Sequence, residues 1–216
     1  AEDYVYQIKR LVHPKLHSPI AGFMRKYIMG LSKLADTLRV ADSRGELIDL
    51  REYQLEGAKA TGKYKFQVKI KGKYPQFKYW LAMSFFAPVP WEAEQFYSQK
   101  GMKERNLTFD WYPVGTGPFM LTENNPNRRI VLKRNPNYRL EYHPADLEKE
   151  KARRLPLVEK ALFSLEKESI PEWTKFLQGY YDTSGVLSDS FDQVITFNSR
   201  GDFRLAQEMV NKGIRL

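Results

Sequence analysis

The apolar residues of this chain change their spacing from one segment to the next, which restricts the folds open to it. Residues 5–12 and 20–31 carry apolar side chains three and four positions apart, the spacing of an amphipathic helix. Residues 64–70 instead alternate, with Phe66, Val68 and Ile70 separated by lysine and glutamine. A period of two is typical of a half-buried strand. The chain is therefore predicted to combine helices with strands.

The second half of the chain shows the same mixture. Residues 119–121 and 130–133 flank the turn-forming sequence Asn124-Asn125-Pro126-Asn127 and predict a hairpin. The charged stretch 141–154 is predicted to be solvated. The other predicted elements are a helix over 91–97, a strand over 161–165, a helix over 169–178 ended by Gly179, and a helix over 202–212 ended by Gly213. Helices mixed with local hairpins predict an α+β (mixed α/β) fold.

Composition excludes several kinds of protein. The 216 residues include no cysteine, which excludes disulfides, thiolate metal sites and cysteine nucleophiles. No segment approaches the run of about 20 apolar residues that a membrane-spanning helix needs. The sequence opens on Ala1-Glu2-Asp3, already the acidic first turn of a helix, so we expect that a preceding segment with any signal peptide has been removed. The net charge of +9 decides nothing by itself.

The sequence carries none of the familiar catalytic or cofactor motifs. His13 and His17 stand four apart, but Pro14 lies between them and no third metal ligand is evident. The glycines around Thr116 run into Pro118 and a predicted strand, whereas a dinucleotide loop opens a helix. We therefore predict no catalytic residue, no metal site and no cofactor. The many carboxylates leave an acidic catalytic pair open.

Residues 63–80 interleave lysines with aromatic residues, as does a groove that binds single-stranded nucleic acid. In a strand, however, Phe66 falls on the face opposite to Lys65 and Lys69, as in any amphipathic strand. A basic single-stranded nucleic-acid-binding module therefore remains the alternative function, and steeply salt-dependent oligonucleotide binding would be its mark.

Several segments, in this order along the chain, match motifs of one known family. They are AEDYVYQIKRL at 1–11, YPQF with LAMS and APVP within 74–90, GTGPF at 115–119, IVLKRNPNY at 130–138, and FLQGYYD at 176–182 with KGIRL at 212–216. The match over 115–138 is the strongest, with Arg139 where the family pattern usually has tryptophan. Through these motifs the chain resembles the extracellular solute-binding proteins of bacterial ABC importers, family 5, which include oligopeptide- and dipeptide-binding proteins.

The resemblance implies part of a type II periplasmic-binding-protein-like fold. Residues 1–112 would form part of the small inserted lobe and its return, and residues 113–216 part of the first large lobe. It also implies a non-catalytic, periplasmic component that captures a peptide or another small solute and delivers it to an ABC permease in the membrane. Members of the family are longer than this chain, so we expect a truncated piece whose uncovered surface could self-associate.

The resemblance further implies two groups of ligand-facing residues. One group precedes the Pro-Val-Pro turn at 88–90, and the other follows the helix over 169–178. They are Ser84, Phe85, Phe86, Tyr181, Asp182, Thr183 and Ser184. The aromatic rings would supply apolar contact area, and Asp182 would pair with a cationic group such as a peptide amino terminus. The competing interpretation, which residue by residue is the stronger one, is that Phe85 and Phe86 belong to the core and that Asp182 serves a turn or a cap.

Overall fold

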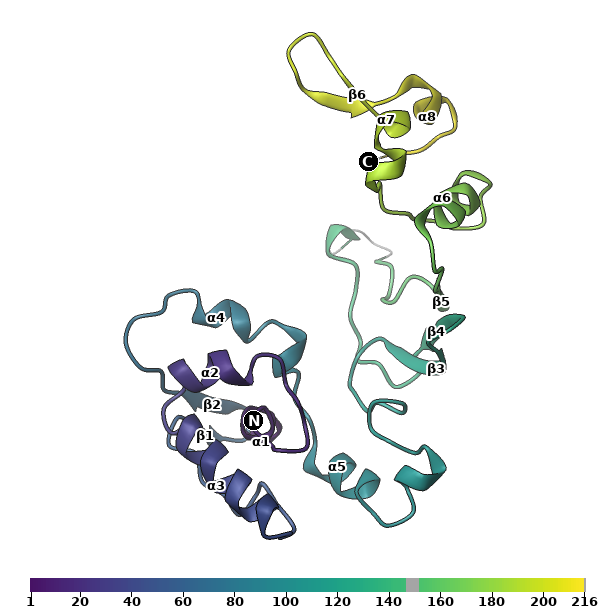
Figure 1. Cartoon of the computed structure of the whole chain (residues 1–216). Coiled ribbons are helices and arrows are strands. Elements are labelled where there is room, and N and C mark those ends of the chain that lie inside the picture. The colour runs from purple at the N-terminus through teal and green to yellow at the C-terminus, as the bar shows by residue number, and fades with distance from the viewer. Residues whose placement is uncertain (147–151, 216) are drawn as a thin grey trace. The chain divides into compact units, whose positions relative to one another are not determined.

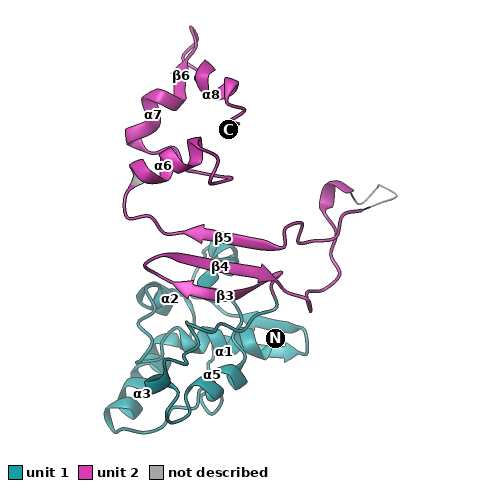
Figure 2. Ribbon diagram, turned by 90° about the vertical axis from the view of Figure 1, so that its right-hand side faces the viewer, with its two compact units in different colours: residues 1–116 teal, residues 117–216 magenta. Residues whose placement is uncertain are grey.

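The computed structural model describes residues 1–146 and 152–215 and divides the chain into two compact units, 1–116 and 117–216 (Figure 1). Figure 2 colours the two units separately. Both contain helices as well as paired strands, which confirms the predicted α+β class. The stretch 141–154, predicted to be solvated, includes residues 147–151, which lie outside the described part. Within the described ranges, no helix is long and apolar enough to cross a membrane.

Unit 1 (1–116) is built from short helices around one hairpin. Its elements are α1 (Glu2–Arg10), α2 (Ala21–Tyr27), α3 (Leu31–Ser43), β1 (Ala58–Gly62), β2 (Lys65–Val68), α4 (Phe77–Trp80), the 3₁₀ turn η1 (Ser84–Phe86), α5 (Trp91–Tyr97) and the 3₁₀ turn η2 (Lys103–Arg105). Helix α1 packs against both strands of the hairpin. Helix α5 has the predicted bounds, because Pro90 adopts an extended backbone directly before it.

The core of unit 1 gathers the apolar faces that the helical spacing predicts. Ile8 of α1, Met24 of α2 and Leu38 of α3 are all at most 1% exposed and belong to one cluster. The predicted pattern over 20–31 is divided between α2 and α3, because the chain leaves the helix at Ile28 to bridge Ile70. Gly30 then turns the chain with φ of 74°, a conformation that glycine adopts without steric cost.

The hairpin β1–β2 confirms the half-buried strand predicted over 64–70. Its strands are antiparallel, with Ala58 opposite Val68 and Ala60 opposite Phe66. Phe66 and Val68 are partly buried against the core, whereas the side chains between and beside them are exposed. The partner strand β1 was not predicted, because the sequence AKATG has little apolar content of its own.

Unit 2 (117–216) contains a three-stranded antiparallel sheet followed by short helices and a second hairpin (Figure 2). Its elements are β3 (Phe119–Asn125), β4 (Arg129–Arg134), the 3₁₀ turn η3 (Pro144–Asp146), β5 (Lys160–Ser164), α6 (Ser169–Leu177), α7 (Ser188–Val194), β6 (Ile195–Phe197), β7 (Phe203–Leu205) and α8 (Gln207–Asn211). The sheet order is β3-β4-β5. These assignments confirm the predicted hairpin, the strand near 161–165 and the helix near 169–178, which Gly179 ends with φ of 81°.

The predicted helix over 202–212 is wrong in its first half. Residues 203–205 form strand β7, which pairs antiparallel with β6 so that Phe203 lies opposite Phe197. Ala206 is extended, and only the five residues of α8 are helical before Gly213 turns the chain with φ of 76°. The spacing of apolar residues here suits a helix, but pairing with residues 195–197 decides the outcome.

Candidate functional site

The first predicted ligand-facing segment is the turn η1 in unit 1. Ser84 is exposed, Phe85 is half-buried, and Phe86 is 2% exposed within the core cluster. Helix α1 is hydrogen-bonded to this turn, because Gln7 Nε2 donates a hydrogen bond of 2.7 Å to the carbonyl oxygen of Phe85. Phe86 therefore anchors the turn, while Ser84 and part of Phe85 reach the surface of unit 1.

The second predicted segment, 181–184, follows α6 in unit 2. Its first residue is fixed, since the Tyr181 hydroxyl donates a hydrogen bond of 2.5 Å to Glu166 Oε1. Lys175 Nζ donates to the same oxygen at 2.5 Å. The hydrogen bond from Lys175, and to a smaller extent the one from Tyr181, holds the pKa of the Glu166 carboxyl below its usual value. The contact ties the start of the segment to residues before and within α6.

Beyond Tyr181 the segment opens to solvent. Asp182 and Thr183 are exposed, and Ser184 is half-buried. The carboxylate of Asp182 forms no ion pair with any side chain that the structure describes. The structure thus keeps 181–184 together as one anchored strip and 84–86 together as another, in different units.

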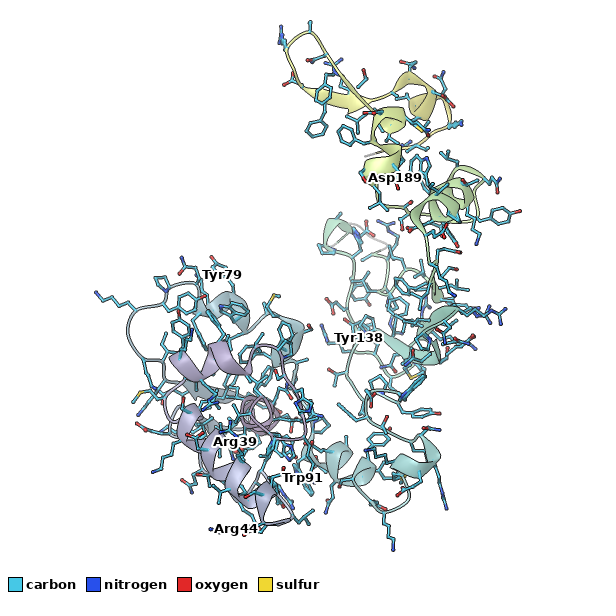
Figure 3. All side chains as sticks on the ribbon, viewed as in Figure 1. Arg39, Arg44, Tyr79, Trp91, Tyr138 and Asp189 are labelled. Atoms are coloured by element: carbon cyan, nitrogen blue, oxygen red, sulfur yellow. The ribbon has the colours of Figure 1, made fainter. Side chains whose placement is uncertain are left out.

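A hollow of about 260 Å³ lies between α6 and the chain leading into α7. Its walls include the apolar side chains of Ile170, Leu177 and Leu187, together with Trp173 and Ser184. Glu172 and Asp189 also line it. Asp189 lies in the first turn of α7 (Figure 3). Apolar walls with a few polar groups are the usual make-up of a small-molecule site.

Trp173 adds an unusual feature to this hollow. Its indole Nε1 is buried and has no hydrogen-bond acceptor among the described residues. A buried donor without a partner is costly, and an acceptor oxygen on a bound molecule would relieve that cost. The hollow is therefore suited to a small solute that carries an acceptor oxygen.

Sequence reasoning missed the residues that organise this region. Glu166 and Lys175 stand on either side of the start of α6, and no motif or helical spacing marks them as a pair. Trp173 shares the three- and four-residue apolar spacing of Ile170, Phe176 and Leu177, a pattern that predicts a buried helical stripe and marks no binding residue. Ile170 departs from that stripe, since it is 64% exposed.

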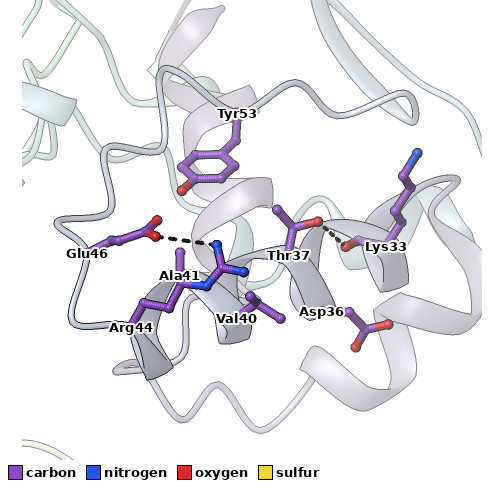
Figure 4. A pocket seen from close by; sticks show the side chains of 8 residues that line it. All are labelled: Lys33, Asp36, Thr37, Val40, Ala41, Arg44, Glu46 and Tyr53. Carbon is purple, nitrogen blue, oxygen red and sulfur yellow. Dashed lines mark hydrogen bonds and ion pairs between the residues drawn. The ribbon is translucent and has the colours of Figure 1, made fainter.

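A larger hollow of about 660 Å³ lies along the outer side of α3 in unit 1 (Figure 4). Much of its polar surface is already engaged locally: Arg44 pairs with Glu46 at 3.6 Å, and the Thr37 hydroxyl donates to the Lys33 carbonyl at 3.0 Å. Asp36 pairs with Arg25 at 3.2 Å. None of the predicted site residues lies here, and the arrangement is that of a solvated helix face.

Two other kinds of site find no support in the described part of the chain. No three His, Asp or Glu side chains there converge to form a metal site. The aromatic ring of Phe66, which a nucleic-acid groove would need, is stacked on Tyr4 with ring centroids 4.8 Å apart. Lys65 of β2 and Lys69, which directly follows that strand, are exposed on the opposite face.

Comparison with known families decides between the remaining interpretations. The family model of bacterial extracellular solute-binding proteins, family 5 (Middle), matches residues 1–207. The chain belongs to this family. Family 5 relatives include the probable deoxycholate-binding periplasmic protein YgiS of Escherichia coli K12, 26% identical over 143 residues, and the periplasmic oligopeptide-binding protein OppA of Salmonella typhimurium, 28% identical over 138 residues.

The solved structures agree with this family 5 assignment at the level of the fold. The structure of Burkholderia pseudomallei OppA matches 89% of this chain with a TM-score of 0.60 at 19% identity. This likeness confirms that the chain forms part of a type II periplasmic-binding-protein-like fold. The matched region covers 33% of that structure, and 24% and 22% of YgiS and OppA respectively. The chain therefore spans about a quarter of the length of the curated relatives it matches.

Proposed function

We propose that this chain serves in a non-catalytic receptor that captures a small solute in the periplasm and delivers it to the membrane permease of an ABC importer. The observation that carries the proposal is the family 5 match over residues 1–207. The solute is a peptide or another small molecule, since relatives are named for deoxycholate as well as for oligopeptides. The exposed carboxylate of Asp182, beside a largely apolar hollow, suits a solute with a cationic end.

The two units correspond to different lobes of the proposed receptor. Residues 1–112 form part of the small inserted lobe and its return, and residues 113–216 form part of the first large lobe. The change of unit at 116–117, close to that boundary, supports the assignment. Self-association belongs to the same proposal, because exposed apolar side chains such as Phe197 and Phe203, 63% and 68% exposed, favour contact with a second copy.

The seven residues named from the sequence act in three ways. Ser84 and Phe85 face the solute from η1, and Phe86 holds that turn in the core. Tyr181, fixed by Glu166, sets the start of the second strip. The remaining residues of that strip, Asp182, Thr183 and Ser184, offer a carboxylate and two hydroxyls, and Asp182 pairs with the amino terminus of a peptide.

Replacing Asp182 by asparagine is expected to weaken binding of a peptide with a free amino terminus by about 10- to 100-fold. A hydrogen bond to a charged group contributes about 1.5–3 kcal/mol, and about 1.4 kcal/mol corresponds to tenfold in affinity. Titration calorimetry with a mixed tetrapeptide library measures the loss. The same peptides with an acetylated amino terminus should bind the original chain and the variant equally.

Asp192→Asn is the matched control, because Asp192 is also an exposed aspartate of unit 2 and lies on α7. Its affinity for the peptides should stay within about twofold of the original, since it lies outside the proposed strip. Equal losses in both variants, or acetylated peptides that bind as tightly as free ones, would rule out the role given to Asp182.

A further inference from the structure

The region from Gly57 to Trp91 carries positive charge without any negative charge. It contains seven lysines and neither aspartate nor glutamate, and it contains no arginine. The lysines are Lys59, Lys63, Lys65, Lys69, Lys71, Lys73 and Lys78. All seven are exposed, and none forms an ion pair within the described part of the chain.

The hairpin β1–β2 collects several of these lysines on one face. Residues two apart in a strand point the same way, so Lys65 and Lys69 share the solvent face with Gln67. Lys59 of β1 lies directly opposite Gln67 and therefore joins them. Lys71 continues the alternation just beyond Ile70, which bridges Ile28 on the inner side. We name Lys59, Lys65, Lys69 and Lys71 the lysine face.

The tip of the hairpin adds an aromatic side chain to this charge. Tyr64 is 84% exposed, and the Lys63 ammonium lies 5.4 Å from the centre of its ring. The inner side of the hairpin is fixed against the core, because Phe66 stacks on Tyr4 and Val68 packs beside it. The lysine face is therefore held on a packed scaffold, with an exposed tyrosine at its end.

We propose that the lysine face is a docking surface for the anionic headgroups of a membrane. Lysines close to an anionic lipid surface each strengthen binding about fivefold. Tyrosine is favoured at the membrane interface, where its ring meets the headgroups and its hydroxyl remains hydrated. This goes beyond the capture of a solute and does not depend on which solute is bound.

The observations favour lipid headgroups over a nucleic acid. Recognition of single strands stacks successive bases on several aromatic faces beside the charge. Phe66 is stacked on Tyr4 and Tyr74 is stacked on Tyr27 at 4.5 Å, so of the rings of Phe66, Tyr74 and Tyr64 only the last is open, at one end of the lysine face. Arginine, the side chain that grips phosphate with two parallel hydrogen bonds, is missing from the whole region. Lysines act instead as separate point charges, which suits the diffuse charge of a lipid surface.

The test is co-sedimentation of the full chain with vesicles made of equal parts phosphatidylglycerol and phosphatidylcholine. The triple variant Lys59→Gln, Lys65→Gln, Lys69→Gln is expected to bind these vesicles about 100-fold more weakly than the original chain. The matched control is Lys103→Gln, Lys133→Gln, Lys160→Gln, which removes the same charge from exposed lysines outside the hairpin. It is expected to bind within about fivefold of the original. Circular dichroism checks that both variants are folded.

Each other result overturns the proposal. Equal weakening of the two triple variants would mean that net charge alone attracts the chain. Absence of binding to the anionic vesicles, or equal binding to vesicles of pure phosphatidylcholine, would remove the lipid partner. A single-stranded oligonucleotide that binds more tightly than the vesicles, and only when the three lysines are present, would assign the lysine face to a nucleic acid.

Discussion

Replacing Leu38 by alanine is expected to lower the free energy of unfolding of unit 1 by about 2–5 kcal/mol. Leu38 lies on α3, is fully buried at 0% exposure, and belongs to the cluster that joins α1, α2 and the hairpin. The substitution removes apolar atoms from the core and leaves a cavity that the surrounding helices fill only in part. Urea unfolding followed by circular dichroism measures the change.

Val40→Ala on the same helix is the control for Leu38→Ala. Val40 is 48% exposed, so its loss removes little buried surface. We expect the free energy of unfolding to change by no more than about 0.5 kcal/mol. If both variants unfolded at the same urea concentration, the core assigned to unit 1 would be wrong.

The substitution Gly57→Ala is expected to destabilise unit 1 by about 2–4 kcal/mol. A Cβ atom at residue 57 would stand 2.7 Å from the backbone nitrogen of Met29 and would also collide with its carbonyl oxygen. This contact lies where two backbone hydrogen bonds interlock: Met29 N donates to Lys69 O at 3.1 Å, and Lys69 N donates to Gly57 O at 2.8 Å. Separating these segments weakens both bonds and loosens the hairpin from α2.

Gly62→Ala, five positions further along the same hairpin, tests that explanation for Gly57. A Cβ atom there would meet nothing within 4 Å, and the backbone is not left-handed. The melting temperature of Gly62→Ala should match that of the original chain, whereas Gly57→Ala should melt several degrees lower. Equal melting of all three proteins would show that the close approach of Met29 to Gly57 is not part of the folded state.

Local pattern predicts those elements whose sequence signals agree with one another. Helix α6 combines regular apolar spacing with a glycine just past its end, and α5 begins after a proline, so both were predicted nearly to the residue. Strand β1 and the pair β6–β7 were not predicted. Their residues become strands through pairing with segments that are close in space, and that pairing leaves no periodic signal in the residues themselves.

In the candidate site, too, some residues are predicted from the sequence and others depend on contacts that only the fold creates. The strip 181–184 was predicted from its resemblance to a family motif, not from its chemistry. Its anchor, in which Glu166 accepts from both Lys175 and Tyr181, depends on how the chain enters α6 and leaves it. The same holds for Trp173, whose unpaired indole nitrogen is a property of packing. Which residues come into contact and which are buried depends on the fold, and a single sequence does not contain that information.

Native mass spectrometry of the purified chain tests most directly whether it is a solute-binding part of an importer. We expect a population heavier than the 25.4 kDa chain by the mass of one small molecule, which denaturation releases for identification. A stripped sample should regain the same mass on incubation with the released solute. A chain that carries no small molecule as purified, and gains no mass with peptides or deoxycholate, would contradict the proposal that it binds a solute.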